Sequence, residues 1–246
     1  MNYKLNPLFS NDFKDFTLEI RSFFTANTKT IHKARNELKT IEYNSTLTVV
    51  KSFKKPHLLN RIVYSFFRDS KAKKSYEYSL KLKNFAPKPI SYIEFYEDNL
   101  LSDSYFISEE FLYDFTIREP LLDEKFPDRD TIFKAFARFT LELHNHDIFH
   151  QDYSPGNILI KKENENYVFK IVDVNRMGFF QLSEEERAKG FSKLWASETA
   201  LKTIATEYKN HFNCADDFIE KTLHYSLQNK KIKNFKKRLK GKEIDW

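Results

Sequence analysis

Alternating apolar and polar residues in the first part of the chain predict β-strands. The alternation runs through residues 13–53. Its clearest stretch is 46–53, Thr-Leu-Thr-Val-Val-Lys-Ser-Phe, which is rich in β-branched residues and follows the turn-forming pair Asn44-Ser45. We therefore expect strands in this part of the chain.

One helix and one hairpin are expected next. Apolar residues four positions apart predict a helix over 71–84: Ala72, Tyr76 and Leu80. Residues 89–96 and 104–109 are rich in β-branched and aromatic residues and flank the turn-forming pair Asp98-Asn99. These two segments therefore predict the strands of a hairpin.

The period of the apolar positions changes near Asp130, which is a suitable N-cap. A helix is expected there from apolar residues spaced three and four apart: Ile132, Phe136, Phe139 and Leu143. Two short apolar strands, 158–160 and 168–172, follow this helix. After Asp173 the chain is expected to be mostly helical, with two signals: a capping box of Ser183 with Glu186, and an apolar stripe of Leu201, Ile204 and Tyr208.

This order of elements predicts an α+β fold with two lobes. The N-lobe, residues 1–110, is strand-rich and contains one helix that we expect to lie beside the nucleotide-covering strands. The C-lobe, residues 111–246, is reduced, mostly helical, and carries the candidate catalytic loop, the metal site and the C-terminal helices.

Composition narrows the possible classes of protein. The chain has 246 residues, of which 41% are hydrophobic, so it can bury a sizeable core. A single cysteine excludes an intrachain disulfide framework and a cysteine zinc cluster. No apolar run has the length of a spanning helix or signal peptide, and we expect a cytoplasmic protein. None of the four glycines precedes Gly156, which excludes an N-terminal glycine-rich phosphate loop.

The net charge of +6 is distributed in blocks. Residues 51–88 contain eleven Lys or Arg against two acids, and residues 89–130 contain twelve acids against three basic residues. Residues 230–242 contain eight basic residues and no acid. Basic stretches attract the phosphates of nucleotides or anionic lipids. The alternative for each stretch is a solvated helix face.

The stretch His150-Gln151-Asp152-Tyr153-Ser154-Pro155-Gly156-Asn157 has the form H-x-D-x-x-x-x-N and precedes an apolar strand. A second apolar strand ends at Asp173. This arrangement resembles the kinase catalytic loop and its metal-binding Asp. Asp152 is the candidate for orienting and deprotonating an acceptor hydroxyl. Asn157 and Asp173 are the candidates for holding Mg²⁺. The alternative is a polar hairpin turn that binds nothing. We assign no chemistry to His150.

A kinase-like site also needs a strand lysine and a helix glutamate. Lys51 lies in Val-Val-Lys-Ser-Phe, a context similar to the kinase strand, and Glu77 is the one acid on the predicted helix 71–84. We assign both to the catalytic machinery, and Lys51, Arg35 and Glu109 to nucleotide binding. The alternatives are an edge-strand lysine for Lys51 and an i,i+4 partner of a helix lysine for Glu77.

The chain departs from the protein-kinase pattern in three places. Residues 28–36, where a phosphate-covering loop would lie, contain no glycine. Asp173 is followed by Val-Asn, and no proline follows Pro155, so an Ala-Pro-Glu motif is absent. The segment after Asp173 is short for a peptide-docking lobe. The expected acceptor is therefore a small molecule or a glycolipid.

Together these motifs resemble the Kdo/WaaP-type lipopolysaccharide kinase family. The resemblance covers roughly residues 30–180 and includes two further stretches, 67–77 and Asp173-Val-Asn-Arg-Met177. It implies a protein-kinase-like fold and phosphorylation of a sugar of the lipopolysaccharide inner core, Kdo or heptose, with ATP and Mg²⁺. It also implies action on the cytoplasmic face of the inner membrane of a Gram-negative cell.

Basic segments fit a peripheral contact with that membrane. Ile232, Phe235 and Leu239 lie among the eight basic residues of 230–242 and predict an interfacial helix, or alternatively a helix packed on the C-lobe. Two other functions stay open: phosphorylation of a different small sugar, and nucleotide binding without catalysis. Nucleic acid is not an expected partner, since residues 89–130 are acidic and no reader motif is present.

Overall fold

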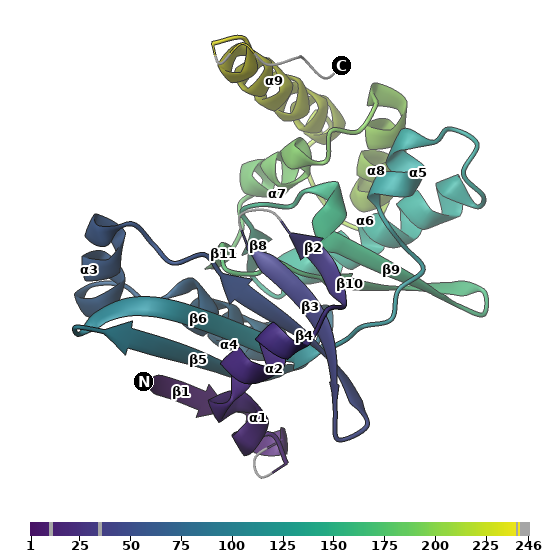
Figure 1. The fold of residues 1–246 in the computed structure, drawn as a ribbon. Helices are drawn as coiled ribbons and strands as arrows, with labels where there is room; N and C mark the ends of the chain where they lie inside the picture. Colours follow the sequence, from purple (N-terminus) through teal and green to yellow (C-terminus); the bar gives the residue numbers. More distant parts are fainter. Residues whose placement is uncertain (10–11, 34–35, 240, 242–246) are drawn as a thin grey trace. The chain divides into compact units, whose positions relative to one another are not determined.

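The computed structural model describes residues 1–9, 12–33, 36–239 and 241 (Figure 1). Its contacts divide the chain into two compact units. The first unit comprises residues 1–112 with 173–175, and the second comprises residues 113–172 with 176–246. Assigning the nucleotide to one lobe and catalysis to the other stays a prediction.

The first unit is built on a six-stranded antiparallel sheet of order β1-β5-β6-β4-β3-β2. Its strands are β1 (Asn2–Leu5), β2 (Thr30–Lys33), β3 (Glu37–Tyr43), β4 (Thr46–Phe53), β5 (Pro89–Glu97) and β6 (Leu100–Glu109). Two-residue turns with positive φ at both positions, Asn44-Ser45 and Asp98-Asn99, join β3 to β4 and β5 to β6. This is the turn geometry that matches the twist of a hairpin, so the strand 46–53 and the later hairpin are confirmed.

Helices cover both faces of this sheet. They are α1 (Lys14–Leu18), α2 (Ile20–Ala26), α3 (Leu58–Phe66) and α4 (Lys71–Leu82), with 3-10 turns η1 (Pro7–Phe9) and η2 (Lys83–Phe85). Ile93 of β5 packs with the buried side chains of α1 and α2, whereas its neighbour Tyr92 packs against Tyr76 of α4. Because adjacent strand residues face opposite ways, α4 lies on the face opposite α1 and α2. The helix predicted over 71–84 is confirmed.

The expectation of strands was wrong for the stretch before residue 27. Buried apolar side chains there follow a helical spacing of three and four residues: Phe13, Phe16, Ile20 and Phe24. These side chains form one cluster with sheet residues that include Ile41, Val50 and Ile107. Burial of this aromatic stripe on the sheet stabilises α1 and α2, which are too short to be stable alone.

The second unit contains two small sheets and most of the longer helices. Its elements are β7 (Phe115–Thr116), α5 (Arg118–Leu122), α6 (Arg129–Asn145), β8 (Ile148–His150), η3 (Pro155–Asn157), β9 (Ile158–Glu163), β10 (Asn166–Ile171), β11 (Met177–Phe179), α7 (Glu184–Gly190), η4 (Phe191–Lys193), α8 (Glu198–Asn210) and α9 (Phe218–Arg238). The predicted helix after Asp130 is confirmed as α6, although its N-cap residue is Asp128. The capping box of Ser183 and Glu186 is also formed.

A polar network is buried where α6, α7 and α8 meet. The Arg187 guanidinium donates to the Tyr208 hydroxyl at 2.9 Å, and that hydroxyl lies 2.9 Å from Nδ1 of His144. Arg187 can only donate, which leaves the hydroxyl proton of Tyr208 available for Nδ1 of a neutral His144 ring. Burial, with the Arg187 charge nearby, lowers the pKa of His144 to about 3. The network links three helices of the second unit through one uncharged histidine.

Candidate active site

In the first unit, the predicted strand lysine pairs with the predicted metal-binding aspartate. Lys51 lies on β4 near the middle of the sheet, and its Nζ is 2.5 Å from Oδ1 of Asp173. The lysine side chain is only 12% exposed, so the ion pair is partly shielded from water. The Nζ also lies 5.3 Å from the centre of the Phe53 ring, two residues along the strand. The fold therefore joins two motifs that are 122 positions apart in the sequence.

The backbone at Asp173 has an unusual conformation that turns the chain after β10. Its φ is +55°, a left-handed conformation that Asp tolerates better than most residues. Two residues later, the Asn175 side chain donates from Nδ2 to Oδ1 of Asp173 at 2.6 Å. The same carboxylate oxygen thus accepts from Lys51 and from Asn175. The short Asp-Val-Asn segment fixes the Asp173 side chain by a local hydrogen bond.

In the second unit, His150 holds the candidate catalytic loop against the end of β10. Its Nδ1 accepts from the backbone N–H of Asp152 at 3.0 Å, and its Nε2 lies 3.1 Å from the carbonyl oxygen of Val172. An acceptor role for Nδ1 places the proton on Nε2, which donates to Val172. The Val172 N–H in turn donates to the Asn157 carbonyl at 2.9 Å. Asp152, Asn157 and the residue before Asp173 therefore belong to one hydrogen-bonded network.

Tyr153 anchors the loop in the core of the second unit. Its side chain is 3% exposed, stacks on Phe136 of α6 with ring centroids 5.7 Å apart, and lies 3.0 Å from the Thr140 hydroxyl. Burial raises the pKa of the Tyr153 phenol well above its usual value. The phenol is therefore neutral at physiological pH and acts as a structural anchor, beside an Asp152 side chain that is one-third exposed.

The Asp152 carboxylate has a cationic partner that the sequence motif did not assign. Nη1 of Arg176 lies 3.2 Å from Oδ2 of Asp152, and the backbone carbonyl of Arg176 accepts from the Gln151 N–H at 3.0 Å. The ammonium of Lys193, on η4, donates to the Gln151 carbonyl. Two basic side chains are thus placed at the candidate catalytic loop. The sequence gives one indication of this role for Arg176, which is its position three residues after Asp173.

The side chains present fit a Mg²⁺ ion in their chemistry. Asn157 donates from Nδ2 to the Asp152 carbonyl at 2.9 Å, which leaves its amide oxygen as the atom able to act as a ligand. Asp173 supplies a carboxylate that already holds a cation, the Lys51 ammonium. Among the described residues no cluster of three or more acidic, His or Cys side chains could bind a metal alone. Each of these oxygens is of a type that Mg²⁺ accepts as a ligand, commonly together with substrate phosphates, and their joint role in one metal site stays a prediction.

The other predicted residues are placed as follows. Glu77 is half-buried on α4 and forms no ion pair with Lys51, whose acidic partner within the described residues is Asp173. Glu109 ends β6, where its N–H donates to the Lys88 carbonyl and its carboxylate lies 3.9 Å from the Lys88 ammonium. Arg35 lies outside the described residues. The roles of these three residues stay predictions.

Comparison with known proteins supports the fold. No family model matches the chain, and no curated protein matches it in sequence. A solved structure, "WaaP in complex with acyl carrier protein", matches with a TM-score of 0.62 at 12% identity. The match covers 93% of this chain and 99% of that one. The predicted α+β, kinase-like fold class is confirmed, and it is shared with the protein that gives its name to the family the motifs resemble.

Two features of the helices concern contact with a membrane. None of the helices built from the described residues has both the length and the apolar character that a bilayer-spanning segment needs. Near the C-terminal end of α9, the three apolar side chains singled out in the sequence are exposed: Ile232 by 49%, Phe235 by 61%, and Leu239, the residue after the helix, by 72%. Their contact with a membrane stays a prediction.

Proposed function

We propose that this protein is an ATP-dependent kinase that phosphorylates a hydroxyl group of a sugar. The observation that carries the proposal is the network in which His150 links Asp152 to Val172, the residue directly before Asp173. The buried His150 ring holds the Asp152 backbone and the end of the strand that leads to Asp173, which is an arrangement that a catalytic loop requires. The kinase-like fold supports the same interpretation, because the residues occupy motifs of that fold.

Asp152 is the proposed base. As the acceptor oxygen bonds to the γ-phosphorus, the bond from that phosphorus to the β–γ bridging oxygen breaks, and ADP leaves. The Asp152 carboxylate takes the hydroxyl proton as the new bond forms, so charge and atoms balance. Its one-third exposure leaves the carboxylate open to an acceptor, while Arg176 and the bonds of its own backbone hold it in place.

Lys51, Asp173 and Asn157 are the proposed phosphate and metal residues. Asp173 and Asn157 would hold a Mg²⁺ ion, which neutralises phosphate charge when bound. Lys51 would exchange its contact with Asp173 for an oxygen of the nucleotide phosphates, since both are anionic partners for one ammonium. The sheet residues around Lys51 shield its ammonium from water and so strengthen its electrostatic contacts, although the Asp173 side chain is 37% exposed.

The acceptor we propose is a sugar of the lipopolysaccharide inner core, Kdo or heptose. Two observations support this class: the motif resemblance and the WaaP-like fold. A second small sugar is the alternative within the same chemistry. WaaP is in complex with acyl carrier protein in the matching structure, and we carry no partner over from that complex.

Incubation with ATP, Mg²⁺ and lipid A–Kdo acceptors, read by mass spectrometry, tests the proposal. The expected result is one added phosphate on the acceptor. Asp152→Asn should lower transfer by at least about a hundredfold while ATP binding is retained. The matched control is Asp147→Asn, at an exposed aspartate of the α6–β8 turn. Nucleotide binding without transfer to any sugar would instead support a non-catalytic kinase-like protein.

A further inference from the structure

Helix α3 of the first unit packs on the protein through its polar side. Arg61 donates from Nε to the Leu101 carbonyl at 2.8 Å, and the Leu101 N–H donates to the Ser65 hydroxyl at 2.8 Å. Arg61 also lies 3.8 Å from the Glu97 carboxylate. These contacts tie one face of α3 to the end of the β5–β6 hairpin. Arg61 and Ser65 are four residues apart, so they share that face.

The apolar side of α3 is exposed instead of buried. None of its nine residues is buried. The large apolar side chains that follow its outer face, with the residue after the helix, are Leu58 (61% exposed), Leu59 (78%), Ile62 (38%), Phe66 (63%) and Phe67 (78%). An ordinary surface helix packs its apolar stripe on the core and turns its polar face to water. The reversed arrangement in α3 indicates a surface that another apolar phase covers.

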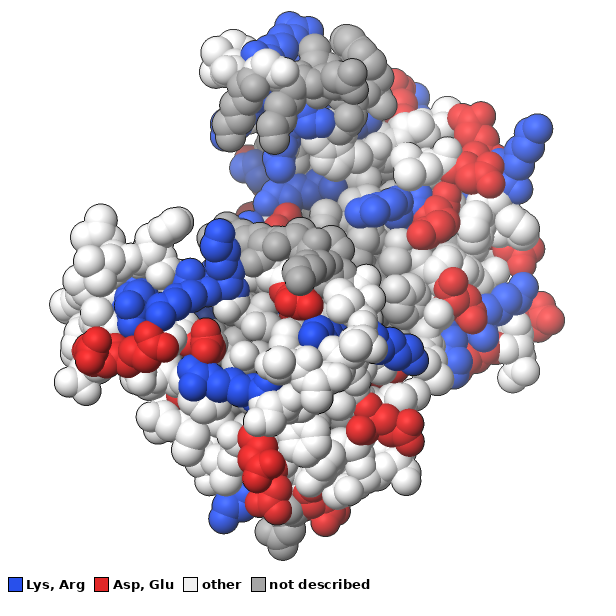
Figure 2. Space-filling model, in the orientation of Figure 1, with Lys and Arg blue, Asp and Glu red and all other residues white. Residues whose placement is uncertain are grey.

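The segment that contains this exposed apolar face is rich in basic residues. The sequence from 51 to 88 has eleven Lys or Arg and two acids, and one of these acids, Asp69, is paired with Lys73 at 2.7 Å. Figure 2 shows uncharged surface over α3 with Lys and Arg side chains on one side of it and Asp and Glu side chains on another. A helix with exposed Leu and Phe flanked by lysines is typical of a segment that lies in the interface of an anionic membrane.

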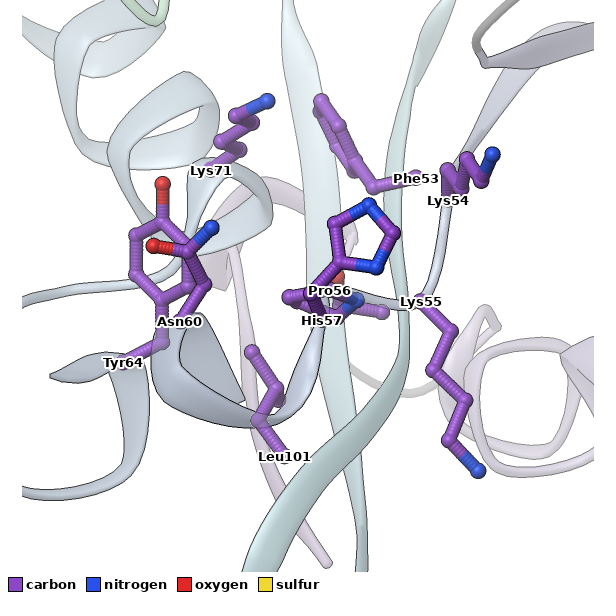
Figure 3. A pocket seen from close by; sticks show the side chains of 10 residues that line it. Phe53, Lys54, Lys55, Pro56, His57, Asn60, Tyr64, Lys71 and Leu101 are labelled. Carbon is purple, nitrogen blue, oxygen red and sulfur yellow. The ribbon is translucent and has the colours of Figure 1, made fainter. Parts of the chain in front are cut away.

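A basic cavity opens at the start of α3. It has a volume of about 220 Å³, and its lining comprises Phe53, Lys54, Lys55, Pro56, His57, Asn60, Tyr64, Lys71, Leu101 and Ser104. Figure 3 shows Lys71 and Tyr64 on one side of it and Phe53 and Lys54 on the other. Three of these lining residues are lysines and none is acidic, although the Lys55 ammonium is paired with the Glu97 carboxylate at 2.6 Å. Ammonium, hydroxyl and amide donors around one small cavity suit the phosphate of a lipid headgroup.

We propose that α3 and the cavity at its start dock the protein on an anionic phospholipid bilayer. Leu58, Leu59 and Phe66 enter the boundary between headgroups and acyl chains, while Lys54 and Lys71 contact lipid phosphates. A bilayer fits better than a protein groove, because the apolar side chains project from a single convex helix with cations on its flanks. The inference rests on the proposed function only in that a lipopolysaccharide acceptor lies in such a bilayer.

Vesicle flotation without nucleotide or sugar acceptor tests the docking surface. The full chain should bind vesicles of phosphatidylcholine and phosphatidylglycerol in equal parts, and bind far less to phosphatidylcholine alone. Leu59→Ser with Phe66→Ser should weaken binding by about 30-fold, since each loses an inserted apolar side chain. Lys54→Gln with Lys71→Gln should weaken it by about tenfold at low salt and much less at high salt.

Three controls separate this surface from others. Leu122→Ser changes an apolar residue of the second unit that is 75% exposed, and it should leave binding unchanged. Phe66→Trp should give fluorescence that brominated lipids quench, whereas both native tryptophans, Trp195 and Trp246, belong to the second unit. Ile232→Ser with Phe235→Ser tests α9 by itself.

Three outcomes would overturn the proposal. The chain could fail to bind the anionic vesicles, or only the α9 variant could weaken binding. Brominated lipid could also quench the fluorescence of the Phe66→Trp variant no more than it quenches that of the native chain. A chain that binds vesicles through α3 but transfers no phosphate would uphold the docking surface and remove the kinase assignment. A chain that phosphorylates soluble sugar without vesicle binding would uphold the kinase assignment and remove the docking surface. The two proposals therefore fail separately.

Discussion

Arg176 and Asp152 form an ion pair at the candidate catalytic loop, with Nη1 of Arg176 3.2 Å from Oδ2 of Asp152. The two residues are also linked through the main chain, because the Arg176 carbonyl accepts from the N–H of Gln151. An exposed pair of this kind adds little to stability. Its effect is expected on the orientation of the Asp152 carboxylate.

Arg176→Ala is therefore expected to lower kcat by about 10- to 100-fold while the KM for ATP changes little. Arg176→Lys should restore part of kcat, because an ammonium can still reach one carboxylate oxygen. Steady-state kinetics of both variants, with Lys134→Gln as an exposed control on α6, measure the effect. Equal losses in kcat and in ATP affinity would mean that Arg176 binds the nucleotide and does not position the base.

His150 is expected to act on both stability and catalysis. The ring is 6% exposed and bonds to Asp152 and Val172, so His150→Ala leaves two backbone groups without their partner. Unfolding free energy should fall by about 1–3 kcal/mol, and kcat should fall as well. His150→Gln, which can replace one of the two bonds, should recover part of each. A stable His150→Ala variant with full kcat would contradict the role of this network.

Lys51→Gln should have opposite effects on two ligands. Without nucleotide, Mn²⁺ should bind the chain about fivefold more tightly, because Asp173 no longer has the Lys51 ammonium as partner. ATP should bind at least about tenfold more weakly, because a charged phosphate contact is lost. Mn²⁺ titration by electron paramagnetic resonance and ATP titration by calorimetry measure the two effects, with Lys14→Gln as an exposed control. A loss of affinity for both ligands would contradict the exchange of partners proposed for Lys51.

Local periodicity explains which elements the sequence predicts. β4 and α6 carry repeats of two and of three to four residues that their burial follows closely. Residues 13–26 were misread because Phe16, Leu18 and Ile20 alternate as in a strand, whereas burial against the sheet follows the helical spacing that the same segment also contains. Helix α3 was not predicted at all. Its apolar residues Leu58, Ile62 and Phe66 do recur four positions apart, which is a helical spacing, but the structure alone shows that the polar face makes the tertiary contacts.

In the candidate site too, residues close together in sequence could be predicted, whereas contacts between residues far apart in sequence could not. Asp152 and Asn157 stand out because their spacing within one loop is fixed by the chemistry of the motif. The ion pair of Lys51 with Asp173 depends on tertiary structure, since the sequence favoured Glu77 as the partner of Lys51 and assigned Asp173 to the metal. Arg176 has no motif that reveals its contact with Asp152. Pairings between side chains far apart in sequence are what the fold adds to the motif.

His144 is expected to make folding stability depend on pH. Burial lowers its pKa in the folded protein to about 3, whereas an unfolded histidine has a pKa of about 6.5. As the pH falls below 6.5, the unfolded chain binds a proton that the folded chain does not, so the free energy of unfolding decreases. The slope contributed by this group approaches about 1.4 kcal/mol per pH unit, and the loss continues toward about pH 3.

Urea unfolding between about pH 7 and pH 5 isolates this effect, because exposed carboxylates with lowered pKa values, such as Glu185 and Glu198, titrate at lower pH. His144→Asn keeps an oxygen that can accept from the Tyr208 hydroxyl but carries no titratable ring. This variant should be less stable at neutral pH and show a shallower decline as the pH falls. His224→Asn, at an exposed position of α9, should retain the wild-type slope. A wild-type slope in the His144 variant would assign the pH dependence to another group and remove the neutral histidine from the network of Arg187 and Tyr208.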